Sequence, residues 1–145
     1  DALAQATGVA NRFPNRAANT RAIRISDPGV ASAILDTFGR CPRTTTCASV
    51  QTPPLSLKQS LLLIGGDVIE SKVGNLNGYL ASALKLELEP EELVENLYYR
   101  TVCRPPSAEE SSRWAAELKQ ATSLPEAAED LFWALLNSRE FALNH

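Results

Sequence analysis

Residues 89–106, EPEELVENLYYRTVCRPP, contain the start, the buried face and the end of one predicted helix. Pro90 suits the first turn of a helix, and the acidic residues around it face the positive end of the helix dipole. The pair Pro105-Pro106 ends the helix, because proline cannot continue it. Apolar side chains between these points recur three and four residues apart, which is the spacing of a single helical face. That face comprises Leu93, Val94, Leu97, Tyr98 and Val102.

Two further helices are predicted after this one. Ser107 with Glu110, and Ser123 with Glu126, have the spacing of a capping box. In a capping box a hydroxyl and a carboxylate satisfy the first free N–H groups of a helix. Residues 131–136 are apolar on all sides, so we expect the last helix to cross the core.

The same apolar spacing predicts helices upstream, over 30–38, 57–73 and 76–84. The pair Gly65-Gly66 falls in the middle of the second of these and is expected to weaken or bend it. Asp1–Gly8 is predicted to be the end of a helix, because glycine is the commonest residue just after a helix C-terminus.

Only one short segment has the alternating pattern of a strand, residues 21–25, where Ile23 and Ile25 flank Arg24. Residues 39–56 contain three prolines and four threonines and are predicted to form a long loop. The sequence therefore predicts an all-α fold of about six helices in an irregular bundle, with at most one short strand.

Composition limits the class of protein. The chain has 145 residues, 44% of them apolar and 21% charged, which fits one folded domain and not a disordered segment. No Met is present, so we expect 1–145 to be a single helical domain from the C-terminal part of a larger protein. No signal peptide opens this piece. Its longest apolar runs fall far short of the roughly 20 residues that span a bilayer.

Charge is unevenly distributed. Residues 1–50 carry six Arg and three Asp, whereas 51–145 carry eight Lys or Arg and fourteen Asp or Glu. The arginines predict either a surface that faces anions or ion pairs with the acidic part of the chain or of the parent protein. Nucleic acid is not an expected partner, because aromatic residues are scarce here and no known motif is present. The candidate anion-binding residues are Arg21, Arg24, Arg40 and Arg43.

The cysteines do not form a known reactive motif. Cys41 and Cys47 lack the C-x-x-C spacing of redox and zinc sites, and Cys47 stands where a tyrosine phosphatase loop has Arg. They are predicted to form either a small disulfide loop or two free thiols. Cys103 is predicted to be a small buried apolar residue. Tyr98, Tyr99, Trp114 and Trp133 are predicted to pack in the core. We expect no catalytic residue, no metal site and no cofactor in this piece.

The most specific string is 129–145, EDLFWALLNSREFALNH. It closely resembles the closing string E-D-L-x-W-A-L-L-N-S-x-E-F-x-x-N-H of a planctomycete-type C-terminal domain of unknown function, family fifteen fifty-three of that series, the planctomycete surface-domain type. The resemblance extends over the whole chain. Further motif positions of the family fall on Ala2, Gln5, Thr7, Gly8, Val9, Thr20, Arg21, Ala22, Phe38, Gly39, Arg40, Cys47, Leu57, Gln59, Leu61, Leu63, Gly66, Leu97, Tyr98, Arg104 and Pro106.

The chain departs from the family pattern in the loop. Cys41 replaces a Pro of the family, and residues 47–51, CASVQ, stand where the family often has C-E-C-E-R. The second Cys, both acidic residues and the Arg are absent. A charged or thiol site of the family is therefore not expected here, and the additional Cys41 favours a local disulfide with Cys47.

The resemblance implies an exported protein, periplasmic or on the cell surface. Family members are large, and this region follows another domain of unknown function and often a cytochrome-c-like domain that carries the haem. The expected function is a non-catalytic structural or interaction module that packs on the upstream domain of the same polypeptide through residues 1–50. The alternative is that the candidate arginines contribute to a site for an anionic, sulfated glycan in the parent protein.

Overall fold

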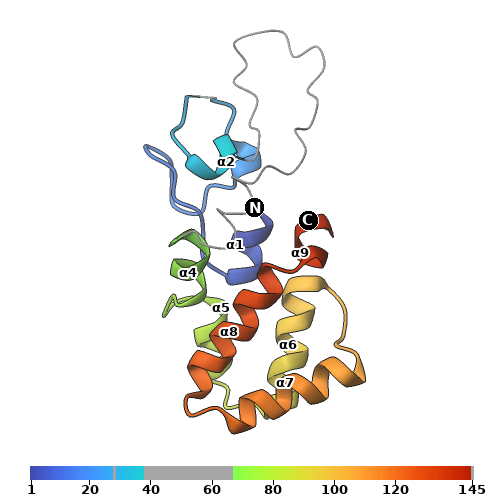
Figure 1. Cartoon of the computed structure of the whole chain (residues 1–145). Coiled ribbons are helices and arrows are strands. Elements are labelled where there is room, and N and C mark those ends of the chain that lie inside the picture. The colour runs from blue at the N-terminus through green and yellow to red at the C-terminus, as the bar shows by residue number, and fades with distance from the viewer. Residues whose placement is uncertain (28, 38–66, 145) are drawn as a thin grey trace. The chain divides into compact units, whose positions relative to one another are not determined.

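The computed structural model describes residues 1–27, 29–37 and 67–144 (Figure 1). Within these residues the chain forms eight α-helices and no strand, and 62% of them are helical, so the all-α prediction is confirmed. The elements are α1 (Ala2–Thr7), the 3-10 helix η1 (Ala22–Arg24), α2 (Ala33–Thr37), α4 (Asp67–Val73), α5 (Tyr79–Leu84), α6 (Pro90–Val102), α7 (Ala108–Gln120), α8 (Leu124–Leu136) and α9 (Arg139–Asn144).

The chain divides into two compact units. The N-terminal unit comprises Asp1 and Ala10–Gly66, and the helical unit comprises Ala2–Val9 and Asp67–His145. Helix α1 is therefore separated along the sequence from the other helices of its unit. The predicted loop 39–56 and the predicted helical residues 57–66, with Gly65 and Gly66, lie outside the described residues.

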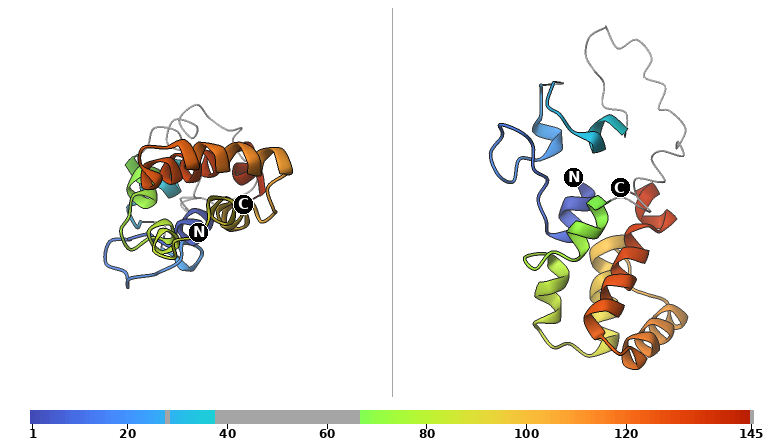
Figure 2. Two further views of the ribbon diagram at one scale, coloured as in Figure 1. Left: turned by 90° about the horizontal axis from the view of Figure 1, so that it is seen from below. Right: turned by 60° about the vertical axis from the view of Figure 1, so that its left-hand side comes forward.

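The core of the helical unit lies among α6, α7 and α8. Figures 1 and 2 show α6 and α8 side by side, with α7 crossing at one end of the pair, and all three helices contact one another. Helix α8 also contacts α4, α5 and α9. The buried apolar side chains of this unit are Ala6, Ile69, Val73, Leu80, Ala83, Leu93, Val94, Leu97, Tyr98, Val102, Ala115, Leu118, Ala128, Leu131, Phe132, Leu135, Leu136 and Phe141.

Local sequence rules predicted α6 and the start of α7 correctly. All five residues of the predicted α6 stripe are buried, and Pro90 occupies the first turn of the helix. At α7 the Ser107 hydroxyl accepts from the Glu110 N–H (3.2 Å), and the Ser107 N–H donates to Glu110 Oε2 (2.7 Å). The end of α1 is also as predicted, with Gly8 at a left-handed φ of 69°.

The second predicted capping box is wrong. Helix α8 does begin after Ser123, but the Ser123 side chain makes no capping hydrogen bond. An N-cap hydroxyl accepts from the second or third N–H of its helix. Pro125 is the second residue of α8 and has no N–H, so one of the two groups that Ser123 could bind is missing.

Residues 21–25 do not form the predicted strand. Three of them form η1, and the Asp1 carboxylate accepts from the N–H groups of Ala22 (2.8 Å) and Ile23 (3.1 Å) at its start. These two hydrogen bonds satisfy the N–H groups of Ala22 and Ile23, which in a strand would bind a neighbouring strand. The N-terminal unit also buries the side chains of Phe13 and Val30.

Helix α8 is not buried on all sides as predicted, and it is not the last helix. Trp133 is 38% exposed, whereas Leu131, Phe132, Leu135 and Leu136 of the same helix are buried. The chain ends α8 at Leu136 and starts α9 with the Ser138 hydroxyl accepting from the Phe141 N–H (3.1 Å). The core prediction also fails for Tyr99, which is 50% exposed, but it holds for Tyr98.

Two more side chains differ from their predicted surroundings. Cys103 was expected to be buried, but it is exposed, because the chain leaves α6 at this residue with a left-handed φ of 57°. Leu76 was expected on the buried face of a helix over 76–84. The helix starts only at Tyr79, and Leu76 lies in the preceding turn with an exposed side chain.

Candidate functional site

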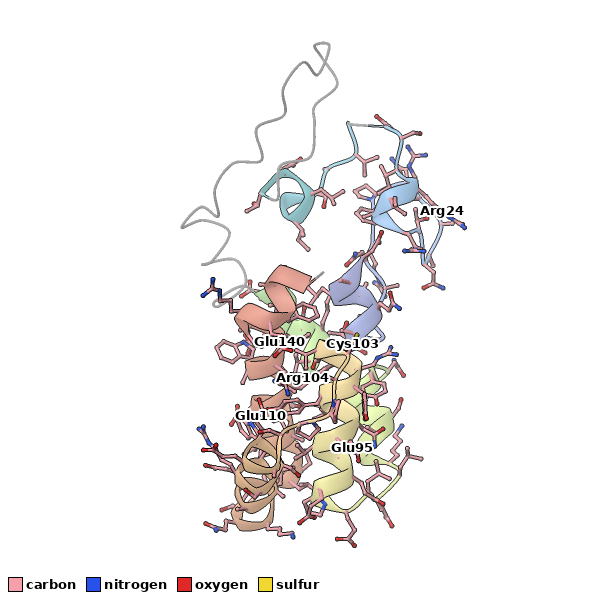
Figure 3. All side chains as sticks on the ribbon, turned by 90° about the vertical axis from the view of Figure 1, so that its right-hand side faces the viewer. Arg24, Glu95, Cys103, Arg104, Glu110 and Glu140 are labelled. Atoms are coloured by element: carbon pink, nitrogen blue, oxygen red, sulfur yellow. The ribbon has the colours of Figure 1, made fainter. Side chains whose placement is uncertain are left out.

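Among the described residues, a cluster of charged groups surrounds Arg104, between α6 and α7. Its guanidinium donates to both oxygens of Glu140 through Nε (2.8 Å) and Nη2 (2.9 Å). It also donates to both oxygens of Glu110 through Nη1 (2.8 Å) and Nη2 (2.9 Å), and Nη1 donates to the Pro105 carbonyl (3.0 Å). Figure 3 shows Arg104 beside the two carboxylates. We call Arg104, Glu110, Glu140 and Ser107 the Arg104 cluster.

Electrostatics within the Arg104 cluster favour the charged forms. The hydrogen bonds from Arg104, followed by the Ser107 backbone N–H, lower the pKa of Glu110 to about 2. The Arg104 guanidinium also lowers the pKa of Glu140, and the two carboxylates raise the pKa of Arg104. Beneath the cluster the Tyr98 ring lies 5.4 Å from the guanidinium carbon, and burial raises the pKa of its hydroxyl.

The Arg104 cluster joins distant parts of the helical unit. A guanidinium has five N–H donors, and all five of those on Arg104 are used within the chain. The two-point pairing with each carboxylate fixes both distance and orientation. The cluster therefore holds the α6–α7 turn against α9, and it leaves no guanidinium N–H for a ligand.

The Arg104 cluster makes stability depend on pH on the acid side. The folded-state pKa of Glu110, about 2, lies below its ordinary 4.5, so the unfolded state binds more protons between these values. The stabilisation is present above pH 4.5 and is lost as the pH falls towards 2. We expect Glu110→Gln to flatten this part of the profile in urea unfolding curves. Glu95→Gln, which changes an exposed residue of α6, is the control, and equal flattening by both variants would contradict the assignment.

A second set of contacts holds the C-terminal end of α1. Lys72 of α4 donates through Nζ to the Val9 carbonyl (2.6 Å). Arg100 of α6 donates through Nε to the Ala6 carbonyl (3.0 Å) and through Nη2 to the Gln5 carbonyl. The guanidinium carbon of Arg100 lies 4.6 Å from the centre of the Tyr79 ring. We call Lys72, Gly78, Tyr79 and Arg100 the α1 docking site.

The α1 docking site matches the chemistry of a helix end. The last four carbonyls of a helix lack partners within the helix, and cations at this end interact favourably with its dipole. Lys72 is 7% exposed, and burial lowers the pKa of its ammonium group. Burial therefore disfavours its charged form, and the Val9 carbonyl accepts a hydrogen bond from Nζ at this position.

The predicted anion-binding arginines are described only in part. Arg21 and Arg24 bracket η1 and are exposed, as Figure 3 shows for Arg24. Arg21 Nε lies 4.0 Å from the Asp1 carboxylate, which belongs to the same unit. Arg40 and Arg43 lie outside the described residues, as do Cys41 and Cys47, so the predicted disulfide stays a prediction.

A shallow depression of about 350 Å³ lies at the turn between α7 and α8. Three carboxylates line it, from Glu117, Glu126 and Asp130, together with small polar side chains of the turn. In the part of the chain that the structure describes, no group of three His, Cys, Asp or Glu side chains is arranged to hold a metal ion.

Sequence reasoning did not identify Lys72, Arg100 or Glu140 as residues of a site. Arg104 and Glu140 belong to residues 97–106 and 129–145, and the structure brings these two segments together. Lys72 and Arg100 gave no signal in the sequence, because their partners are backbone carbonyls of a distant segment.

The described ranges form an all-α protein with ionic clusters at helix ends. None of its described helices has both the length and the apolar character needed to cross a membrane. Comparison of the chain with known protein families, with characterised proteins and with solved structures found no match.

Proposed function

We propose that this chain is a non-catalytic structural or interaction module of an exported, multi-domain protein of the planctomycete type. The observation that carries the proposal is the Arg104 cluster, in which all five donors of one guanidinium bind groups of the same unit. Its two carboxylates are held in their charged forms, as a structural ion pair requires and as a general acid does not. This chemistry is suited to holding helices together.

The N-terminal unit supplies the proposed contact surface. Ile23 in η1 is 79% exposed, and the exposed cations Arg21 and Arg24 flank it. Arginine is enriched at protein interfaces, and the fully buried centre of an interface is more apolar than its rim, so an exposed Ile between two arginines suits a contact surface. The partner we propose is the domain that precedes this chain in the same polypeptide.

Association with the preceding domain tests this proposal. We expect the chain to co-elute with that domain in size-exclusion chromatography at micromolar concentration. Ile23→Asp is expected to weaken the association about tenfold or more, because it places a charge at the centre of the contact. Leu76→Asp is the matched control, since Leu76 is equally exposed but belongs to the helical unit. No co-elution at micromolar concentration, or equal loss with both variants, would contradict the proposal.

A second candidate function is the binding of an anionic, sulfated glycan. The observation that favours it is that Arg21 and Arg24 are exposed at the two ends of one turn, near in sequence to Arg40 and Arg43. Guanidinium groups suit sulfate oxygens, and such binding weakens as salt rises.

A heparin column with a salt gradient tests the glycan function. We expect the double variant Arg21→Gln, Arg24→Gln to elute at clearly lower salt than the wild type. Arg113→Gln with Lys119→Gln removes the same charge from α7 and is the control. Elution of the wild type at very low salt, or equal shifts for both double variants, would exclude this function.

A further inference from the structure

We propose that the α1 docking site is a receptor for the C-terminal end of a short helix, and that α1 occupies it as a separable segment that the α1 of a second copy can replace. This inference goes beyond the proposed function and does not depend on it. It names an interaction surface within the helical unit and the kind of partner that fits it, a short helix that ends in glycine.

Recognition at this site is directed at the backbone. Lys72 and Arg100 bind the carbonyls of Gln5, Ala6 and Val9, and neither cation uses a side chain of α1. The Arg100 guanidinium lies over the Tyr79 ring, which limits its freedom before the helix end is bound. Arg100 thus binds two carbonyls in the last turn of α1, and Lys72, from a different helix, binds the Val9 carbonyl just after that turn.

Close packing adds selectivity for small residues. Ala6 and Thr7 are 4% and 0% exposed within the helical unit. A Cβ atom on Gly8 would lie 3.1 Å from the Tyr79 nitrogen, and one on Gly78 would lie 3.3 Å from the Thr7 carbonyl oxygen. The φ of 69° at Gly8 also disfavours any residue with a side chain. The site therefore fits a helix that ends in Ala-Thr-Gly.

Helix α1 can be regarded as a ligand that is covalently linked to its own binding site. It belongs to the helical unit, yet residues 10–66 separate it from the helices that bind it. Helix α1 is therefore linked covalently to its binding site through a separate compact unit, and the same segment at sufficient concentration can compete with it. The same segment from another molecule makes identical contacts, so exchange between copies follows from this geometry.

The test uses the full chain with a recognition sequence for a specific protease inserted between Ala17 and Ala18. Both residues are exposed in the N-terminal unit, where an insertion is tolerated. After cleavage we expect the fragment that carries α1 to stay bound during size-exclusion chromatography. An excess of a fluorescent peptide of residues 1–17 is then expected to replace it, with a rise in anisotropy, while the helical circular dichroism of the protein is unchanged.

Two changes probe the contacts that the proposal names. We expect Arg100→Gln in the protein to weaken peptide binding about tenfold, because two charge-assisted hydrogen bonds are lost. Arg113→Gln is the matched control, since Arg113 also lies over an aromatic ring, that of Trp114, but does not contact α1. A peptide with Gly8→Val is expected to bind about tenfold more weakly, because valine is strained at a positive φ.

Three results would overturn the proposal. The first is that the cleaved fragment leaves and the peptide does not bind to the remaining folded protein. The second is that the fragment stays but does not exchange with excess peptide. The third is peptide binding that is unaffected by both Arg100→Gln and Gly8→Val.

Discussion

Replacement of Phe132 by Ala is expected to lower the free energy of unfolding of the helical unit by about 3–5 kcal/mol. Phe132 has no exposed surface, and its ring centre lies 6.5 Å from that of Tyr79. It lies on α8, which contacts α4, α5, α6, α7 and α9, so the cavity would open where most helices of the unit meet. Urea unfolding followed by helical circular dichroism measures the loss.

The neighbouring residue provides the control for Phe132→Ala. Trp133 is the larger side chain, but it is 38% exposed on the other side of α8. We expect Trp133→Ala to cost less than Phe132→Ala, because a smaller fraction of the Trp133 side chain is buried on folding. An equal loss for both variants would show that Phe132 is not at the centre of the core.

The second large effect is expected at the Arg104 cluster. Arg104→Gln leaves Glu110 and Glu140 side by side without the cation that binds both. The three side chains are 38%, 34% and 35% exposed, so solvent screens part of their interaction. We expect a loss of about 1–2 kcal/mol in the free energy of unfolding at pH 7, which is the upper end for a partly exposed ionic network.

A double-mutant cycle shows whether this loss comes from the pairing itself. The loss in the free energy of unfolding is measured for Glu110→Gln, for Arg104→Gln and for the double variant. We expect the double variant to lose less than the sum of the two single losses. Lys119→Gln is the control, because it removes an ion pair with Glu91 in which both side chains are about half exposed. If Lys119→Gln is as destabilising as Arg104→Gln, the Arg104 cluster has no special structural role.

Prediction from sequence succeeded where neighbouring residues determine the outcome. The stripe from Leu93 to Val102, the Ser107 capping box and the glycine end of α1 each depend on residues within a few positions of one another. Such local preferences agree with the final fold, as is common for long periodic segments. The same rules wrongly predicted a capping hydrogen bond for Ser123, although α8 does begin after it.

Prediction failed where contacts between distant segments determine the outcome. The all-apolar string of α8 gave no sign that Trp133 would be exposed, because that choice depends on which helices surround α8. Nothing in the sequence indicated that Lys72 would be buried, because the Val9 carbonyl that it binds lies 63 residues away along the chain. The sequence also did not indicate that Arg104 would bind Glu140, since Glu140 lies on α9.

The discontinuity of the helical unit has a consequence for folding during synthesis on the ribosome. Helix α1 is made before the other helices of its unit, but Arg100, which binds the carbonyls of Gln5 and Ala6, is added 94 residues after Ala6. Glu140, which completes the Arg104 cluster, follows later still. Helix α1 therefore stays without these partners until most of the helical unit has been translated, and contacts of such long range slow folding. A chaperone that binds short apolar helices would find α1 available throughout this interval.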